Sequence, residues 1–123
     1  MYPLHKSDTG SFQELVHKSD VEFGQLSLLT IAPGCTRGGH YHTRKKEWFC
    51  CLHGRCVIVT TDVTIKDQQY ISLSEDNIKF VAVNPRKSHT VVNTGSYKCE
   101  LLVICDEEYD ANNTDTIRYE EET

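Results

Sequence analysis

Short apolar stretches recur along the chain, with turn-forming residues between them. The stretches are rich in β-branched and aromatic residues, which favour strands over helices. They lie at residues 23–31, 48–52, 56–61, 79–83, 90–93 and 101–105. Outside a single turn near residues 11–16, no segment repeats apolar residues at the three- to four-residue spacing of a helix. The pattern therefore predicts an all-β protein with no more than one short helical turn near residues 11–16.

The number of predicted strands limits the architecture. A chain of 123 residues is the size of one ordinary domain, and it contains no internal repeat or low-complexity linker. Many short strands in so small a domain must close or stack their sheets to cover the edges, so we expect a sandwich, jelly roll or barrel. No apolar run approaches the roughly 20 residues that a membrane span requires. Residues 1–6 are polar and lack the apolar segment of a secretion signal, so we expect a cytoplasmic protein.

Charge is distributed unevenly along the chain. The net charge is −5, but eight of the 18 acidic residues follow Cys105, whereas residues 1–105 carry a net charge of +2. This shift predicts a folded domain over 1–105 and an acidic C-terminal arm over 106–123, either extended or partly disordered. Five bases fall within one 19-residue stretch, namely Arg37, Arg44, Lys45, Lys46 and Arg55. Such a local cluster suits a small anionic ligand, whereas nucleic acid calls for a broad basic face.

The six cysteines show no paired spacing, and most of them lie inside the apolar stretches. In a chain without a secretion signal, we expect them to be buried thiols rather than disulfides. No Cys-x-x-Cys pair occurs, which argues against a thiolate zinc ribbon or a thioredoxin-type redox site.

Three histidines and one glutamate are candidate ligands of a metal ion. His40 and His42 are two residues apart, so on a strand both imidazoles project from the same face. Glu47 follows a polar turn that can bring its carboxylate opposite them, and His89 opens a later strand. Three imidazoles and one carboxylate suit Zn²⁺, Fe²⁺, Ni²⁺ or Mn²⁺, and of these we expect zinc. The other histidines are expected to be surface or hydrogen-bonded residues: His5, His17 and His53.

The spacing of these residues resembles the two motifs of the cupin superfamily. The first motif matches at every position, with Gly34, His40, His42, Glu47 and Gly54 at the family's intervals. The second motif consists of Pro85, His89 and Asn93, and it departs from the usual pattern at Asn84, where proline is common, and at Arg86, where glycine is common. The resemblance implies the cupin fold, a double-stranded β-helix or jelly-roll barrel.

A narrower resemblance covers most of the chain. Its segments are residues 8–12, 23–27, 33–42 and 112–116, together with Lys45 and Glu47. They are similar to the cupin domain of the capsular-polysaccharide nucleotide-sugar epimerases. In that family the domain usually follows a nicotinamide-dependent reductase, and no Gly-x-Gly-x-x-Gly dinucleotide motif occurs here. The resemblance implies epimerisation at carbon 3 of a UDP-linked 4-keto-6-deoxy (2-acetamido) sugar, with a separate NAD(P)-dependent reductase as partner. Cupins commonly form dimers, so the resemblance also implies a homodimer.

This reaction needs a base, an acid and a group that stabilises the developing oxyanion. A divalent metal held by the four ligands could polarise the ketone as a Lewis acid. The candidate acid–base residues are His40, Tyr41 and Lys45, with His53 also near in sequence. The candidate substrate-binding residues are Arg37, Gln25 and Arg86, and the planar fork of Arg37 suits a diphosphate.

Three alternatives use the same residues differently. The segment Arg37-Gly38-Gly39-His40 also resembles the dTDP-4-dehydrorhamnose 3,5-epimerases, in which the residue equivalent to His40 is the base and no metal takes part. Under that interpretation Arg37 binds the diphosphate of a dTDP-linked keto sugar. A metal-dependent cupin oxygenase and a non-catalytic sugar-binding cupin are the other two alternatives.

Overall fold

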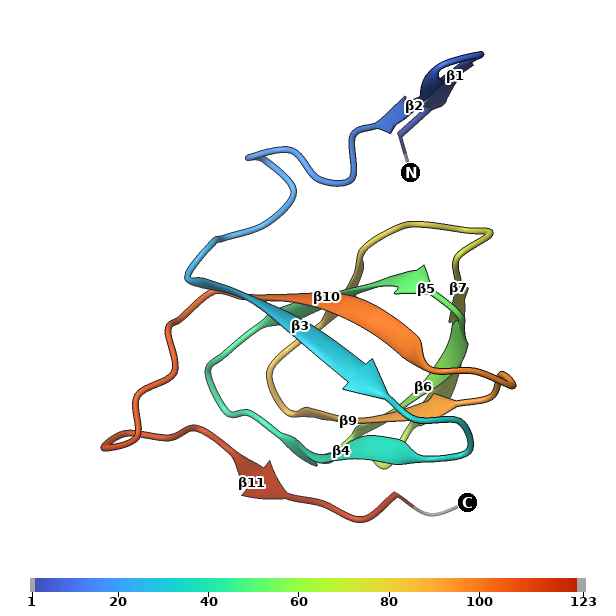
Figure 1. The fold of residues 1–123 in the computed structure, drawn as a ribbon. Helices are drawn as coiled ribbons and strands as arrows, with labels where there is room; N and C mark the ends of the chain where they lie inside the picture. Colours follow the sequence, from blue (N-terminus) through green and yellow to red (C-terminus); the bar gives the residue numbers. More distant parts are fainter. Residues whose placement is uncertain (1, 122–123) are drawn as a thin grey trace.

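The computed structural model describes residues 2–121, so Met1, Glu122 and Thr123 of the predicted domain and arm lie outside the described residues. Within this range the chain forms strands and loops and contains no helix. The strands (Figure 1) are β1 (Leu4–Ser7), β2 (Gly10–Gln13), β3 (Gln25–Ile31), β4 (Thr36–Tyr41), β5 (Glu47–His53), β6 (Arg55–Asp62), β7 (Gln68–Ser74), β8 (Val81–Val83), β9 (Lys87–Asn93), β10 (Cys99–Cys105) and β11 (Ile117–Arg118). The all-β prediction is therefore confirmed.

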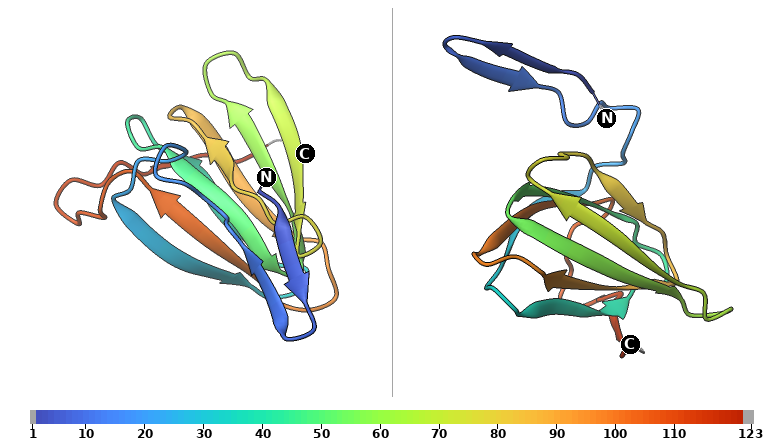
Figure 2. Two further views of the ribbon diagram at one scale, coloured as in Figure 1. Left: turned by 90° about the horizontal axis from the view of Figure 1, so that it is seen from above. Right: turned by 90° about the vertical axis from the view of Figure 1, so that its right-hand side faces the viewer.

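Two antiparallel sheets make up the body of the protein. One has the strand order β3-β10-β5-β8, and the other has the order β11-β4-β9-β6-β7. The sheets face each other, and the chain passes repeatedly from one to the other, as in a jelly roll (Figures 1 and 2). The inner faces supply the core, in which Ile58, Val91 and Leu101 are almost completely buried. Burial of these alternate apolar positions is the main force that holds the two sheets together.

The apolar stretches account for the long inner strands but not for every strand. The stretch at 79–83 forms only the short strand β8, and β4 and β7 have no matching apolar run. The expected helical turn near residues 11–16 is wrong, because residues 10–13 form β2 of a hairpin with β1. The turn of this hairpin is stabilised locally, since the backbone N–H of Thr9 donates to the hydroxyl of Ser7.

The cysteine prediction agrees with the structure. All six thiols are free, five of them are buried, and Cys35 is exposed. Three of the buried thiols belong to the apolar core, namely Cys51, Cys56 and Cys99.

The two ends of the chain extend from the body in different ways. The β1–β2 hairpin stands away from both sheets (Figure 2), and its residues are mostly exposed. At the other end, residues 106–121 leave β10 and run back to the outer edge of β4, where β11 pairs with it (Figure 1). We call residues 106–121 the C-terminal arm. None of the described residues belongs to a helix that could span a membrane.

Candidate metal centre

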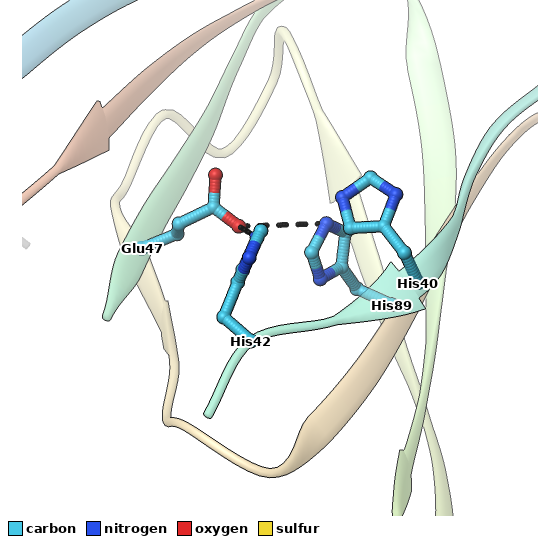
Figure 3. Close-up of side chains that lie close together, drawn as sticks. All are labelled: His40, His42, Glu47 and His89. Carbon is cyan, nitrogen blue, oxygen red and sulfur yellow. Dashed lines mark hydrogen bonds and ion pairs between the residues drawn. The ribbon is translucent and has the colours of Figure 1, made fainter. Parts of the chain in front are cut away.

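Four side chains from three strands and one loop converge on the inner side of the body. They are His40 at the end of β4, His42 just beyond it, Glu47 at the start of β5 and His89 in β9. One potential ligand atom from each lies within 4.8 Å of all the others (Figure 3). Residues that are far apart in sequence thus meet at one point because β4 and β9 are neighbours in one sheet while β5 belongs to the facing sheet.

A β-bulge positions His40. The pairing of β4 with β9 shifts register between Gly38 and His40, so that His40 lies opposite His89. Gly38 and Gly39 have φ angles of 108° and 78°, a region that favours glycine. A Cβ atom on Gly38 would lie 2.6 Å from the carbonyl oxygen of His89. The bulge therefore requires glycine both for its backbone conformation and for its contact with β9.

Substitution of Gly38 tests this role. We expect Gly38→Ala to lower the free energy of unfolding by at least about 2 kcal/mol, since it adds backbone strain and a clash with β9. Gly34→Ala is a matched control, because Gly34 also has a positive φ, of 73°, but a Cβ atom there meets nothing within 4 Å. Chemical denaturation of both variants measures the difference. Equal destabilisation would show that the contact with His89 is unimportant.

Hydrogen bonds fix the orientation of His42. Its Nδ1–H donates to the backbone carbonyl oxygen of Asp115, with 2.5 Å between the heavy atoms. Its Nε2 lies 2.8 Å from Oε1 of Glu47. A carbonyl that holds Nδ1 in this way leaves Nε2 directed toward the cluster, which is the arrangement of a metal-ligating histidine.

His89 is the most deeply buried member of the cluster. It is 3% exposed, and its Nε2 lies 3.5 Å from Oε1 of Glu47. Its ring packs against the rings of His40 and Phe49, with centroid distances of 4.5 and 5.2 Å. Its Nδ1 is buried without a hydrogen-bond partner among the described residues. Three imidazoles around one carboxylate, with one buried ring nitrogen unpartnered among the described residues, fit the donor set of a divalent metal site.

The environment keeps two of the imidazoles neutral at neutral pH. Burial, and to a smaller extent the nearby His42, lowers the pKa of His40, and burial lowers the pKa of His89 to about 4. Burial would also lower the pKa of His42, but the hydrogen bond and charge of Glu47 outweigh burial and raise it. For Glu47 burial favours the neutral acid, but the hydrogen bond from His42 and the three imidazoles lower its pKa. An ionised carboxylate and neutral imidazoles are the forms that bind metal.

The low pKa of His89 predicts that the metal-free protein loses stability in acid. His89 binds a proton near pH 6.5 when unfolded but only near pH 4 when folded, so the unfolded state binds more protons between these values. The free energy of unfolding should therefore fall by about 3 kcal/mol as the pH drops from 6.5 to 4. The lowered pKa of His40 acts in the same direction, whereas the raised pKa of His42 affects stability only above pH 6.5.

Denaturation of the metal-free protein at several pH values measures this effect. In His89→Gln, where residue 89 cannot bind a proton, the free energy of unfolding should change much less between pH 6.5 and 4. If the free energy of unfolding of this variant falls as steeply with pH as that of the wild type, the acid sensitivity does not come from His89.

Two predicted substrate-binding residues lie on inner faces of the sheets. Arg37 is opposite the core residue Val91 across β4 and β9, so it belongs to the inner face of its sheet, and it is exposed. Gln25 is opposite Cys105, which in turn is opposite Glu47, so these three residues share the inner face of the other sheet. Residues from both sheets thus face the same interior as the histidine cluster.

Tyr41 and Lys45 lie between the candidate ligands in the sequence, but their side chains have different surroundings. Lys45 is 6% exposed, and its Nζ lies 5.8 Å from the ring centroid of Tyr109. Tyr41 is half-buried, and its ring centroid lies 6.2 Å from that of Tyr119 in the C-terminal arm. Both candidate catalytic residues therefore pack against tyrosines of the arm.

Arg86 and His53 lie outside the cluster. Arg86 is exposed, and its backbone N–H donates to the carbonyl oxygen of His42 over 2.7 Å. Its φ is 65°, the left-handed conformation that glycine favours, although arginine stands here. His53 is at the far end of β5 from Glu47, about 20 Å away, and its Nδ1 lies 3.2 Å from a carboxylate oxygen of Glu75.

Asp115 and Cys105 belong to the site, although the sequence did not single them out. Asp115 is 5% exposed, and it accepts hydrogen bonds from the loop that follows His42. Cys105 is buried on the inner face, where burial raises the pKa of its thiol and the charges of Glu47 and Lys45 act on it in opposite directions. In the sequence, Cys105 is one apolar-strand residue among several, and Asp115 is one of eight acids after Cys105, marked only by its place in the 112–116 segment that carries the family resemblance.

Comparison with known proteins identifies the family. The sequence profile of the polysaccharide biosynthesis C-terminal domain matches residues 5–117, so this chain belongs to that family. The UDP-2-acetamido-2,6-beta-L-arabino-hexul-4-ose reductase of Pseudomonas aeruginosa is 30% identical over 114 residues, which cover 93% of this chain and 30% of that protein. The predicted relation to the capsular-polysaccharide epimerase domains is thereby confirmed.

Solved structures show the same fold. The capsular polysaccharide assembling protein CapF from Staphylococcus aureus matches with a TM-score of 0.78 and 27% identity, over 98% of this chain and 35% of that chain. The dTDP-6-deoxy-D-glucose-3,5-epimerase RmlC from Legionella pneumophila matches with a TM-score of 0.80 and 16% identity, over 95% of this chain and 69% of that chain. The predicted cupin jelly roll is therefore confirmed. The chain spans about a third of the length of the Pseudomonas and Staphylococcus proteins.

Proposed function

We propose that this protein is a nucleotide-sugar epimerase. Its substrate would be a UDP-linked 4-keto-6-deoxy (2-acetamido) sugar, and the reaction would invert carbon 3, next to the ketone, during synthesis of a polysaccharide precursor. The observation that carries the proposal is the convergence of His40, His42, Glu47 and His89 on an interior that Arg37 also faces. The family match and the similarity to a UDP-sugar reductase support the substrate class.

The four converging side chains are proposed to hold one divalent metal ion, with zinc as the first expectation. The neutral imidazoles of His40 and His89 and the ionised carboxylate of Glu47 are suitable ligands. The hydrogen bond from Nδ1–H of His42 to Asp115 directs Nε2 toward the cluster, where it lies beside Glu47 and would bind the ion in its deprotonated form. When bound, such an ion would supply Lewis-acid polarisation of the ketone, which increases the acidity of the neighbouring carbon.

The protein's own residues would bind the sugar and move the proton. Arg37 is proposed to bind the diphosphate through paired charge-assisted hydrogen bonds, with Gln25 and Arg86 as further substrate contacts. The candidates for removing the proton from one face of carbon 3 and returning it to the other are His40, Tyr41 and Lys45. Tyr41 and Lys45 would act when His40 is bound to the metal, and His40 would take part only in the metal-free mechanism described below. Lys45 is the most buried residue of the three.

Two partners complete the proposal. A separate NAD(P)-dependent reductase would reduce the epimerised ketone, in line with the reductase activity named for the Pseudomonas relative. We also propose a homodimer in the cytoplasm. The projecting β1–β2 hairpin supports the dimer, because an isolated two-stranded hairpin is only marginally stable in water without further packing.

Deuterium uptake tests the proposed reaction. Incubation of the metal-loaded protein with a UDP-4-keto-6-deoxy sugar in heavy water should place deuterium at carbon 3, as seen by NMR and mass spectrometry. The expected exchange is much faster than in a sample without protein. If fully metal-loaded protein exchanges no hydrogen with any such sugar, the epimerase proposal is wrong.

The metal-free mechanism is a second candidate, favoured by the neutral state of His40 and its position three residues after Arg37. In that case His40 alone would abstract the proton. Removal of all metal with a chelator separates the two candidates. Retained exchange supports the metal-free base, lost exchange that returns with added metal supports the metal centre, and iron-dependent oxygen consumption would instead indicate an oxygenase.

A further inference from the structure

We propose that Asp115 is a positioning residue that ties the C-terminal arm to the metal centre and holds His42 in its ligating orientation. The inference rests on the proposed metal site and extends it to a residue about 70 positions further along the chain.

The carboxylate of Asp115 binds the whole loop that follows His42. Its Oδ1 accepts hydrogen bonds from the backbone N–H and the hydroxyl of Thr43, over 2.9 and 2.5 Å. Its Oδ2 accepts from the backbone N–H groups of Arg44 and Lys45, over 2.7 and 3.0 Å. Four donors around one buried carboxylate are the arrangement that binds an anion at a turn, so this contact fixes the loop conformation.

The backbone of the same residue orients the imidazole. The carbonyl oxygen of Asp115 accepts the Nδ1–H of His42, while Nε2 of the ring faces Glu47. The side chain of Asp115 therefore anchors the arm on one side of the loop, and its carbonyl then sets the direction of the ring. In metal sites a carbonyl partner of this kind fixes the tautomer and the ring orientation of the ligand.

Further contacts fasten the arm on both sides of Asp115. Before it, the backbone N–H of Asp106 donates to the carbonyl oxygen of Lys46, and Nε of Arg44 lies 2.9 Å from an oxygen of Glu107. After it, the backbone N–H of Tyr119 donates to Gly39 over 2.8 Å, and β11 pairs with β4. Because Asp115 is buried and the Arg44–Glu107 pair is partly exposed, we assign most of the positioning to Asp115.

Asp115→Asn tests the assignment, with Glu108→Gln as the control. Both changes remove one negative charge from the arm with little change in size, but Glu108 is exposed. Two quantities are measured: the NMR signal of the His42 Nδ1 proton in the metal-free protein, and the dissociation constant of Co²⁺ from its visible absorption. We expect Asp115→Asn to lose the ring proton signal through faster exchange and to bind Co²⁺ about 10- to 100-fold more weakly, with Glu108→Gln unchanged.

Each result has a definite meaning. If Asp115→Asn lowers only the melting temperature and keeps both the His42 signal and the Co²⁺ affinity, the residue is merely structural and the inference is wrong. If Asp115→Asn does not fold, Thr43→Val removes one of the four donors, and an unchanged Co²⁺ affinity and His42 signal in that variant overturn the inference. If the wild type binds no Co²⁺, the metal proposal fails, and the His42 signal of the metal-free protein alone decides the positioning role.

Discussion

Replacement of His42 by alanine is expected to remove most of the bound metal while leaving the fold intact. His42 is the ligand with the most defined orientation, because Asp115 holds one of its ring nitrogens and Glu47 lies beside the other. Its loss leaves three candidate ligands and opens the centre to water. The fold should survive because the apolar core around Ile58, Val91 and Leu101 holds the two sheets together without the ion.

Metal analysis and activity measure this prediction together. The wild type should contain about one divalent ion per chain, and His42→Ala should contain almost none, with kcat/KM lower by about 100-fold or more. His53→Ala is the matched control, since His53 is exposed at the far end of β5. A His42→Ala protein that keeps a full complement of metal would contradict the ligand assignment.

Replacement of Arg37 by methionine is expected to weaken substrate binding without affecting the metal. Methionine keeps an unbranched stem but cannot donate the charge-assisted hydrogen bonds that a diphosphate requires. Such bonds to charged groups contribute about 1.5–3 kcal/mol each, so kcat/KM should fall by about 10- to 100-fold, mainly through KM. The metal content should stay at the wild-type level, because Arg37 is not part of the cluster.

Arg55→Met provides the comparison for Arg37→Met. Arg55 is also exposed and also belongs to the basic stretch, but it begins β6, beyond the end of β5 that is remote from the cluster. Steady-state kinetics with the UDP-linked keto sugar should show a normal KM for Arg55→Met. An equal rise in KM for both variants would indicate a general effect of positive charge and would contradict a specific role of Arg37.

The strands that the sequence predicts well are those with continuous apolar runs. β6 and β10 contribute residues to the core at alternate positions and are also apolar between them, so their composition marks them clearly. β4 contains two glycines and β7 mixes glutamine and serine with its apolar residues, so neither resembles a strand by composition. Their pairing with β9 and β6 depends on contacts between distant segments, which override the local preference of the residues.

The candidate ligands could be predicted because their spacing along the chain has a direct geometric meaning. His40 and His42 are two apart, and Glu47 follows a short turn, so local structure alone brings these three close together. The participation of Asp115 could not be predicted in the same way. Three of its four donors are backbone N–H groups of residues 43–45, which carry no signal in the side-chain pattern, and all four lie about 70 residues away.

The arrangement explains how a small fold can build a defined centre. The two sheets supply the ligands from opposite sides, the glycines of the bulge set the approach of His40, and the arm holds the loop at His42. Each of these elements is rigid for a separate physical reason, namely core packing, backbone conformation and hydrogen bonding. A preorganised site of this kind loses little free energy to reorganisation when a ligand binds.

Diffraction from crystals grown with Zn²⁺ or Co²⁺, measured at the absorption edge of the metal, tests the central claim most directly. The account predicts one strong anomalous peak at bonding distance, about 2.0–2.2 Å, from the imidazoles of His40, His42 and His89 and from the carboxylate of Glu47. The contradictory result is a saturated crystal whose anomalous peaks all lie elsewhere, with the carboxylate of Glu47 still hydrogen-bonded to His42.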